Sequence, residues 1–310
     1  MTPNRARSMV VLLGLVLAAI LPATAAAQQL PVPYSFAAGV AYEVLNPGAS
    51  PPGANDFSCK PTAAHPKPVV LVHGLLGNRT DNWPAMSPLL KNNGYCVFAL
   101  TYGVEPTAPF PLDQVGGLRP IEESTATLSA FIDRVLAATG AREVDLVGHS
   151  EGTLVSAWVA KFLGGAAKID KLVGIAGVYH GTNVAGLARL EPYARQFGIT
   201  APFDRYCAAC IDLLDNSPFI AKLDSGGVAV NGVTYTSIVT RYDELVVPYT
   251  SGTLQAPNAT NIVVQSRCAL DFSDHLSIVA ERNTAQHMLN ALDPAHARPV
   301  ACFPVLPLIG

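Results

Sequence analysis

One five-residue motif, Gly148-His149-Ser150-Glu151-Gly152, constrains the fold more than any other part of the sequence. It follows an apolar β-branched run at 144–147 and precedes a pattern with helical spacing. In such a strand–turn–helix unit the serine occupies a sharp turn, and its flanks must be small because side chains there would collide with the strand and the helix. The motif therefore predicts that Ser150 is a nucleophile exposed at the end of a strand.

Short β-branched and apolar runs alternate with helical patterns from Val69 onward, which is typical of a mostly parallel sheet with helices on both faces. Apolar residues from Ile121 to Leu136 recur at helical spacing, with Gly140 at a C-cap position, and a second helix is expected from Ser150 to about Gly164. These patterns predict one α/β domain over residues 68–310. Its expected strands are Val69–Val72, Tyr95–Leu100, Val144–Val147, Leu172–Ile175, Tyr235–Val239 and Ile262–Val264.

A nucleophilic serine needs a base that takes its proton and an acid that orients the base. When a serine occupies this kind of turn, the order along the chain is serine, acid, histidine. His275 lies in the polar turn 271–276 after the last expected strand, where a loop can present its ring to Ser150. His287, in an expected terminal helix, and His296, near the C-terminus, are the alternatives. We therefore expect His275 to be the base.

The acid should lie in the loop that leaves the next-to-last strand. In this sequence that loop contains Asp243 and Glu244. Asp243 is the expected acid. Glu244 is its closest competitor, and Asp215 is a more distant one.

The oxyanion that forms during acyl transfer needs backbone N–H donors aimed at it in advance. One donor should be the N–H of Glu151, the residue after the nucleophile. A second should come from the loop His73–Gly77, which follows the first expected strand. His73 itself is expected to brace this loop rather than to take part in catalysis.

Residues 1–27 have the pattern of an export signal. Arg5 and Arg7 precede an apolar run from Met9 to about Leu21, which is short for a transmembrane helix of about 20 residues. The small residues Ala25 and Ala27 offer a cleavage site, so we expect cleavage after Ala27 and a secreted protein. An uncleaved N-terminal anchor is the alternative.

Two segments lack a regular pattern. Residues 28–67 are rich in Pro and Gly and are expected to be mostly irregular and to pack on the domain. Residues from about 181 to 232 form an expected insertion that could cap the site and bind acyl chains. Ordinary core packing is the alternative for each of its apolar residues, which are Leu187, Leu190, Tyr193, Phe197, Phe203, Ile211, Leu214 and Phe219.

Six cysteines behind an export signal indicate disulfides. Six cysteines allow 15 pairings. Cys59 with Cys96 and Cys268 with Cys302 are the preferred long-loop pairs, which leaves Cys207 and Cys210 for a small local disulfide. The Cys-x-x-Cys spacing of that last pair could also suggest zinc, but no further ligand lies nearby in the sequence, so no metal is expected.

The net charge of −3, with no block of like charges, argues against nucleic acid or an anionic membrane surface as a partner. Half of the residues are hydrophobic, which leaves apolar surface for a lipid-like substrate and is compatible with transient contact with lipid interfaces. The sequence does not predict the oligomeric state.

Taken in order, several motifs resemble the secreted lipases of actinobacteria that are grouped as lipase class 2. The resemblance implies the α/β-hydrolase fold, hydrolysis of carboxylic esters including acylglycerols, no cofactor, and a triad of Ser150, Asp243 and His275. A similarity to the His-Gly loops of hydrolases implies the Leu75 N–H as the second oxyanion donor. The matching stretches are 51–59, Val69–Gly74, Asp81–Trp83, Val144–Ser150, Tyr242–Glu244 and Asp271–His275.

Glu151 departs from the pattern of these lipases, which more often carry Gln there. A carboxylate near a developing negative charge is unfavourable unless it points away, is paired or is protonated. Glu151 therefore bears on the rate and the pH profile rather than on the reaction class. A polyester depolymerase or an acyltransferase would use the same triad, and a non-catalytic binding protein could use the same fold.

Overall fold

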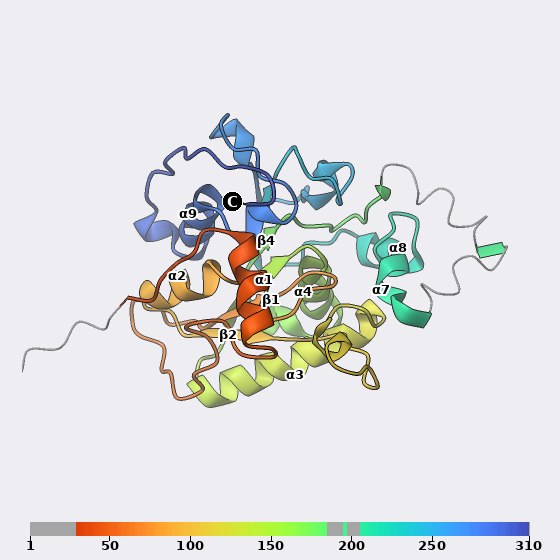
Figure 1. The fold of residues 1–310 in the computed structure, drawn as a ribbon, viewed down its shortest axis with the longest axis horizontal. Helices are drawn as coiled ribbons and strands as arrows, with labels where there is room; N and C mark the ends of the chain where they lie inside the picture. Colours follow the sequence, from red (N-terminus) through yellow and green to blue (C-terminus); the bar gives the residue numbers. More distant parts are fainter. Residues whose placement is uncertain (1–28, 185–194, 197–204, 310) are drawn as a thin grey trace, which may run out of the picture.

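The computed structural model describes residues 29–184, 195–196 and 205–309. A six-stranded sheet in the order β2-β1-β3-β4-β5-β6 crosses the molecule, and every neighbouring pair is parallel (Figure 1). The six predicted strands are all present, but β2 starts two residues later than predicted, and β4 and β6 start three residues earlier. The strands are β1 Val69–Val72, β2 Val97–Leu100, β3 Val144–His149, β4 Ile169–Ile175, β5 Thr234–Val239 and β6 Ala259–Val263.

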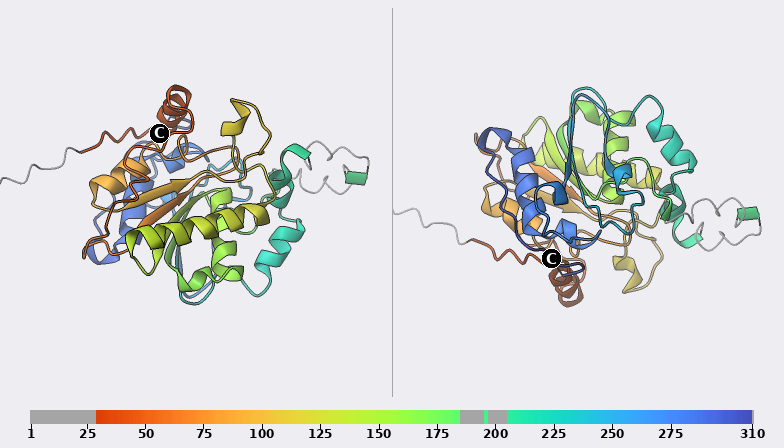
Figure 2. Two further views of the ribbon diagram at one scale, coloured as in Figure 1. Left: turned by 90° about the horizontal axis from the view of Figure 1, so that it is seen from below. Right: turned by 90° about the horizontal axis from the view of Figure 1, so that it is seen from above.

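Helices cover both faces of the sheet (Figure 2). On one face α3 (Ile121–Thr139) and α4 (Glu151–Phe162) pack on alternate strand residues such as Val70 and Leu146. On the other face α2 (Met86–Asn92) and α9 (Arg282–Leu292) pack on the intervening residues, such as Leu71. Side chains alternate between the faces of a strand, so one apolar run supplies both cores. Gly140 ends α3 in the left-handed conformation, at φ 78°, as its position predicted.

The segment 28–67 was expected to be mostly irregular, and its described residues contain one helix that was not predicted, α1 (Phe36–Leu45). Proline lies on both sides of this helix and Gly39 lies within it, so its composition resembles that of a loop. A Cβ atom at Gly39 would clash with the Asp81 carbonyl oxygen and with the Pro84 ring. The glycine therefore lets the helix approach the chain at 81–84 closely.

Part of the expected cap, 181–232, consists of two short helices, α7 (Ala208–Asp212) and α8 (Pro218–Asp224). Phe219 is buried and stacks on Trp158 with ring centroids 4.5 Å apart, so it belongs to the core. Ile211 and Leu214 are half-buried. The other five apolar residues named for this segment, Leu187, Leu190, Tyr193, Phe197 and Phe203, lie outside the described residues.

Three disulfides link Cys59 to Cys96, Cys207 to Cys210 and Cys268 to Cys302. They are the three pairs preferred from the sequence, and the Cys-x-x-Cys pair is a disulfide rather than a free dithiol. Within the described ranges, no helix has both the length and the apolar character needed to cross a membrane. The expected signal segment lies outside those ranges.

Candidate active site

Ser150 occupies the turn between β3 and α4, with φ 51° and ψ −122°. A positive φ is uncommon for a residue other than glycine, so neighbouring contacts must hold this turn. The Ser150 N–H donates to the Ile175 carbonyl oxygen at 3.1 Å. A Cβ atom at Gly152 would clash with the carbonyl oxygens of Val72 and His73. The glycine therefore allows α4 to lie against β1, which supports the strained serine.

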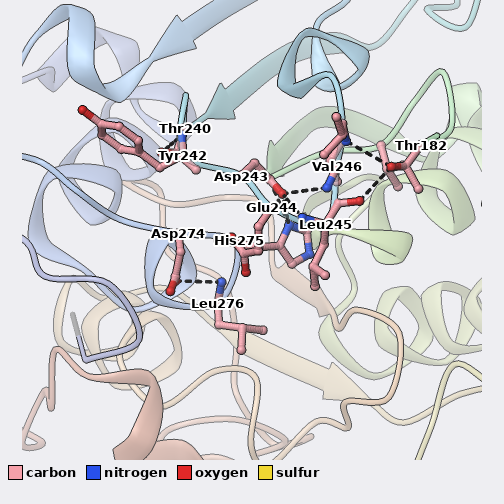
Figure 3. A network of polar contacts seen from close by, with 12 residues as sticks. Thr182, Thr240, Tyr242, Asp243, Glu244, Leu245, Val246, Asp274, His275 and Leu276 are labelled. Carbon is pink, nitrogen blue, oxygen red and sulfur yellow. Dashed lines mark hydrogen bonds and ion pairs between the residues drawn. The ribbon is translucent and has the colours of Figure 1, made fainter. Parts of the chain in front are cut away.

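Asp243 follows β5 and His275 lies between β6 and α9, and the fold brings their side chains together (Figure 3). The His275 Nδ1 atom lies 2.9 Å from each carboxylate oxygen of Asp243. The backbone N–H groups of Leu245 and Val246 donate to Asp243 Oδ1 at 3.1 and 2.7 Å. Both side chains are buried. An Nδ1–H bond to the carboxylate leaves the lone pair on Nε2, the tautomer that can accept a proton.

The residues considered as alternatives to Asp243 and His275 do not form this contact. Glu244 Oε2 accepts a hydrogen bond from the His275 backbone N–H at 3.2 Å, so it contacts the backbone of the histidine rather than its ring. Asp215 is exposed. His287 lies on α9, and His296 is exposed and paired with Asp293. The structure therefore pairs Asp243 with His275, as the chain order predicted.

Ser150 and His275 line one pocket of about 560 Å³. Most of its wall is apolar, and its polar lining residues are Asp81, Asn82, His149, Ser150, Thr182 and His275. This composition suits a substrate with one reacting polar group and an apolar remainder. The larger apolar residues of the wall are Phe36, Val40, Leu75, Leu76, Val178, Val184, Leu213, Leu214, Leu245, Val246 and Leu276.

The loop after β1 lies against the nucleophile. A Cβ atom at Gly74 would be 3.0 Å from Ser150 Cβ, so this close approach needs a glycine. Leu75 lines the pocket. Among the described residues, the backbone N–H groups of Leu75 and Glu151 donate no hydrogen bond. Both predicted oxyanion donors therefore remain available to a ligand.

His73 has the bracing geometry expected for it. Its Nδ1 atom lies 2.8 Å from the Gly74 carbonyl oxygen, and its Nε2 accepts a hydrogen bond from the Tyr102 N–H at 3.2 Å. Its ring stacks on Tyr102. Burial lowers the pKa of His73 to about 4, so the ring is neutral at pH 7. It supports the loop from below and does not line the pocket.

Asn82 was not singled out as a site residue from the sequence, although Asp81-Asn82-Trp83 is one of the stretches that resemble class 2 lipases. Its Oδ1 accepts from the Gly74 N–H at 3.1 Å and lies 2.9 Å from His149 Nδ1. The other ring nitrogen, His149 Nε2, lies 3.0 Å from the His275 carbonyl oxygen. These contacts connect the loop after β1, the serine turn and the histidine loop through buried side chains.

His149 carries no charge at neutral pH. Burial, together with the adjacent His275 ring, lowers the pKa of His149 to about 3. A neutral imidazole has one N–H, so it donates to only one of the two oxygen atoms that it faces.

The Glu151 side chain is fully buried. Neither carboxyl oxygen has a hydrogen-bond partner among the described residues. The nearby Tyr102 hydroxyl donates its proton to the His73 carbonyl oxygen at 2.7 Å. Burial, with a contribution from the negative charge of Asp212, raises the pKa of Glu151 well above its usual value. The sequence indicated that the Glu151 carboxyl must point away from the oxyanion, be paired or be protonated. This environment favours the protonated form.

No group of three or more His, Cys, Asp or Glu side chains in the described part of the chain is placed to hold a metal ion. Cys210, the one residue of the Cys-x-x-Cys motif that lines the pocket, is bonded to Cys207.

A parallel sheet with its serine on a strained strand-to-helix turn and an Asp–His pair from two later loops is the arrangement of the α/β-hydrolase class. Residues 66–288 match the family of class 2 lipases, and the chain belongs to this family. The family membership inferred from the motifs is thereby confirmed.

Curated relatives cover a smaller region. A triacylglycerol lipase of Pseudarthrobacter phenanthrenivorans is 38% identical over 103 residues, which are 32% of this chain and 29% of that protein. A triacylglycerol lipase of Burkholderia plantarii is 38% identical over 103 residues, 32% of this chain and 26% of that protein. The chain thus spans less than a third of the length of these relatives.

Solved structures show the same fold at low sequence identity. Aspergillus fumigatus lipase B superposes with a TM-score of 0.59 at 18% identity, over 81% of this chain and 61% of that chain. The mature form of a Bacillus licheniformis lipase gives a TM-score of 0.54 at 18% identity, over 75% and 94% of the two chains. The predicted α/β-hydrolase fold is confirmed.

Proposed function

We propose that this chain is a secreted serine hydrolase that cleaves carboxylic esters, as a triacylglycerol lipase or carboxylesterase. The observation that carries the proposal is that His275, which contacts Asp243, lines the same apolar pocket as the strained Ser150. The lipase family and the names of the relatives support the same reaction class.

Catalysis would proceed through an acyl-enzyme on Ser150. The Ser150 Oγ attacks the ester carbonyl carbon while His275 Nε2 takes its proton, and Asp243 orients the ring and stabilises its positive charge. The oxyanion accepts hydrogen bonds from the Leu75 and Glu151 N–H groups. The intermediate collapses as His275 returns the proton to the leaving alcohol. Water then attacks the acyl carbonyl carbon while His275 Nε2 takes its proton. The bond between the acyl carbon and Ser150 Oγ breaks, His275 returns the proton to Oγ, and the carboxylic acid leaves.

The first test is hydrolysis of p-nitrophenyl esters with acyl chains of two to sixteen carbons. Ser150→Ala should lose turnover on every ester, whereas Ser225→Ala, which alters an exposed serine, should match the wild type. Labelling by an organophosphonate should also disappear only in Ser150→Ala. An unlabelled wild type with no turnover would overturn the hydrolase and favour a binding protein on this fold.

Two other reactions would use the same residues. In an acyltransferase, an alcohol replaces water as the acceptor, and in a polyester depolymerase the ester belongs to a polymer. The apolar pocket beside Ser150 favours a monomeric lipid-like ester. Ester products formed in the presence of added alcohol, or soluble fragments released from a polyester film, would identify either alternative.

Two features support the proposal that the protein is exported from the cell. The N-terminal signal pattern and the three disulfides both fit an oxidising compartment. N-terminal sequencing of the protein recovered from the culture medium should give Gln28 as the first residue. Retention of the whole protein in the membrane fraction would favour the uncleaved anchor.

A further inference from the structure

The pocket wall includes a helix that lies before the segment matched by the lipase family. The matched segment begins at residue 66, whereas α1 spans Phe36–Leu45. Phe36 and Val40 of this helix line the pocket together with Ser150 and His275. In Figure 2, α1 lies at one surface of the molecule, outside the layered core. The family match alone would not have assigned these two residues to the site.

We propose that α1 forms one wall of the acyl-chain subsite, and that Val40 sets how long a chain the subsite accepts. This inference rests on the ester hydrolysis proposed above. It adds a specificity-determining residue that the triad and the oxyanion donors do not supply.

The spacing of apolar residues on α1 supports the proposal. Phe36 and Val40 are four residues apart and therefore share one face of the helix. Phe36 is half-buried, and the Val40 side chain is 46% exposed even though it lines the pocket. Val44 continues the same face but is 73% exposed and is not part of the pocket. The apolar face thus extends from the pocket at Phe36 into solvent at Val44.

Contacts within α1 and on both sides of it hold the helix in place. The Gly39 backbone packs closely against Asp81 and Pro84. Before the helix, the Asn92 side chain makes two hydrogen bonds of 2.8 Å with the Leu30 backbone. The Arg282 guanidinium also lies 4.2 Å from the Tyr34 ring centroid.

After the helix, the Arg79 and Thr80 side chains donate to the Ala49 carbonyl oxygen. Contacts on both sides of α1 make it a fixed wall, and a fixed wall can discriminate between chain lengths.

The α1 helix also lies near the oxyanion loop. It packs on the chain at 81–84, and the Asn82 side chain of that stretch accepts a hydrogen bond from the Gly74 N–H. His275 returns a proton to the leaving alcohol, so the alcohol must leave past His275. In the proposed subsite the acyl chain, which is bonded to the same carbonyl carbon, runs along α1.

The first experiment compares Val40→Trp with Val44→Trp. Each replaces an exposed valine of the same helix, but only the first enlarges a side chain of the pocket wall. Burying one methylene group changes an affinity by about fourfold, so displacing two or three groups should cost about tenfold or more. We expect Val40→Trp to lose about tenfold or more in kcat/KM for acyl chains of twelve to sixteen carbons. The ratio of kcat/KM on the dodecanoate ester to kcat/KM on the butyrate ester should therefore fall by about tenfold or more.

The Val44→Trp variant should keep the wild-type profile at all chain lengths. An unchanged profile in Val40→Trp, or the same change in both variants, would overturn the assignment of Val40 to the acyl subsite.

A second measurement does not depend on turnover. Binding of dodecanoate is measured by calorimetry in Ser150→Ala, with and without each tryptophan substitution. We expect about tenfold weaker binding only when Val40 is replaced. If dodecanoate binding depends on Val40 but no hydrolysis depends on Ser150, the acyl subsite is supported and the proposed ester hydrolysis is overturned. If hydrolysis depends on Ser150 but dodecanoate binding does not depend on Val40, only the assignment of α1 to the acyl subsite is overturned.

Discussion

The two sides of the candidate site use carboxyl groups in opposite ways. On the acid side, the buried Asp243 carboxylate faces the His275 ring and accepts two backbone hydrogen bonds. On the oxyanion side, the buried Glu151 carboxyl has no hydrogen-bond partner among the described residues. Burial of a carboxylate is tolerated only where partners replace water. The difference teaches that a buried negative charge is stabilised beside the His275 ring and is disfavoured at Glu151, the residue after Ser150.

The histidines of the two sides also differ in their surroundings. His73 and His149, on the oxyanion side, both have pKa values lowered by burial, to about 4 and about 3. They act as neutral hydrogen-bonding groups that hold the backbone. Among the described histidines that line this site or support it, only His275 faces a carboxylate.

Removing the negative charge of Asp243 should lower kcat more than any other change considered. Asp243→Asn preserves the shape of the side chain but lets the amide favour the wrong histidine tautomer, and a change of this kind in a serine protease lowers kcat by about 10⁴-fold. We expect a loss of that order on p-nitrophenyl butyrate, with an unchanged thermal unfolding midpoint as the check on folding.

Glu244→Gln is the matched control for this change. Its side chain contacts the His275 backbone, so kcat should remain within about tenfold of the wild type, since one hydrogen bond contributes about 1 kcal/mol. A larger loss in Glu244→Gln than in Asp243→Asn would transfer the role of the acid to Glu244.

The next largest effect should come from Asn82, which connects the neutral groups of the oxyanion side. Asn82→Ala removes the acceptor for the Gly74 N–H, and small displacements of catalytic groups can cost up to about 100-fold. We expect kcat to fall by 10- to 100-fold with little change in KM. Asn93→Ala, which removes an exposed asparagine, should have no effect. A change confined to KM would show that Asn82 affects substrate binding rather than the catalytic geometry.

Glu151→Gln should alter the pH dependence of activity. The raised pKa of Glu151 keeps the carboxyl neutral beside the oxyanion until the pH passes that value. Above it, a negative charge opposes the oxyanion and the rate falls. The glutamine variant should therefore match the wild type at pH 6 and retain more activity at alkaline pH. Identical pH–rate profiles would show that Glu151 does not titrate in the working range.

The same substitution should change the pH dependence of stability. Between the unfolded pKa of about 4.5 and the higher folded pKa, the unfolded chain binds fewer protons than the native protein. The free energy of unfolding then falls by about 1.4 kcal/mol per pH unit as the pH rises. Denaturant unfolding should show the advantage of Glu151→Gln growing between pH 5 and pH 8. Glu123→Gln, on the exposed side of α3, should show no such trend.

The smallest effect on kcat should come from Thr182, which holds the loop that carries Asp243. Thr182 Oγ1 donates to the Leu245 carbonyl oxygen at 2.7 Å and accepts from the Val247 N–H at 3.0 Å. The same oxygen accepts from the Val184 N–H at 3.2 Å. Thr182→Val should cost about 1–2 kcal/mol of stability, because all three hydrogen bonds are lost. We expect kcat to change by only a few-fold. A loss approaching that of Asp243→Asn would mean that Thr182 positions the acid directly.

The sequence predicted those parts of the structure that depend on local rules. The strained turn at Ser150 requires small neighbours, and the alternating strand and helix patterns reflect a parallel sheet covered on both faces. The Asp243–His275 contact follows from chain order, because both loops leave the same edge of the sheet. Each of these features has a signature within a few residues.

What the sequence missed depends on contacts between distant segments. The composition of 28–67 concealed α1, because the reason for Gly39 is its contact with Asp81. The role of Asn82 depends on His149, 67 residues away. Glu151 is buried near Tyr102, the chain at Gly117 and Asp212, none of which its own motif specifies.

The disulfide between Cys268 and Cys302 closes a ring of chain that contains His275. Closing a loop of this length stabilises a fold by roughly 2–5 kcal/mol. In a reducing compartment the ring stays open, and the histidine loop lacks this constraint. In the exported hydrolase proposed above, oxidation of this cysteine pair would act as a maturation step, since the proposed base would gain its full restraint only outside the cell.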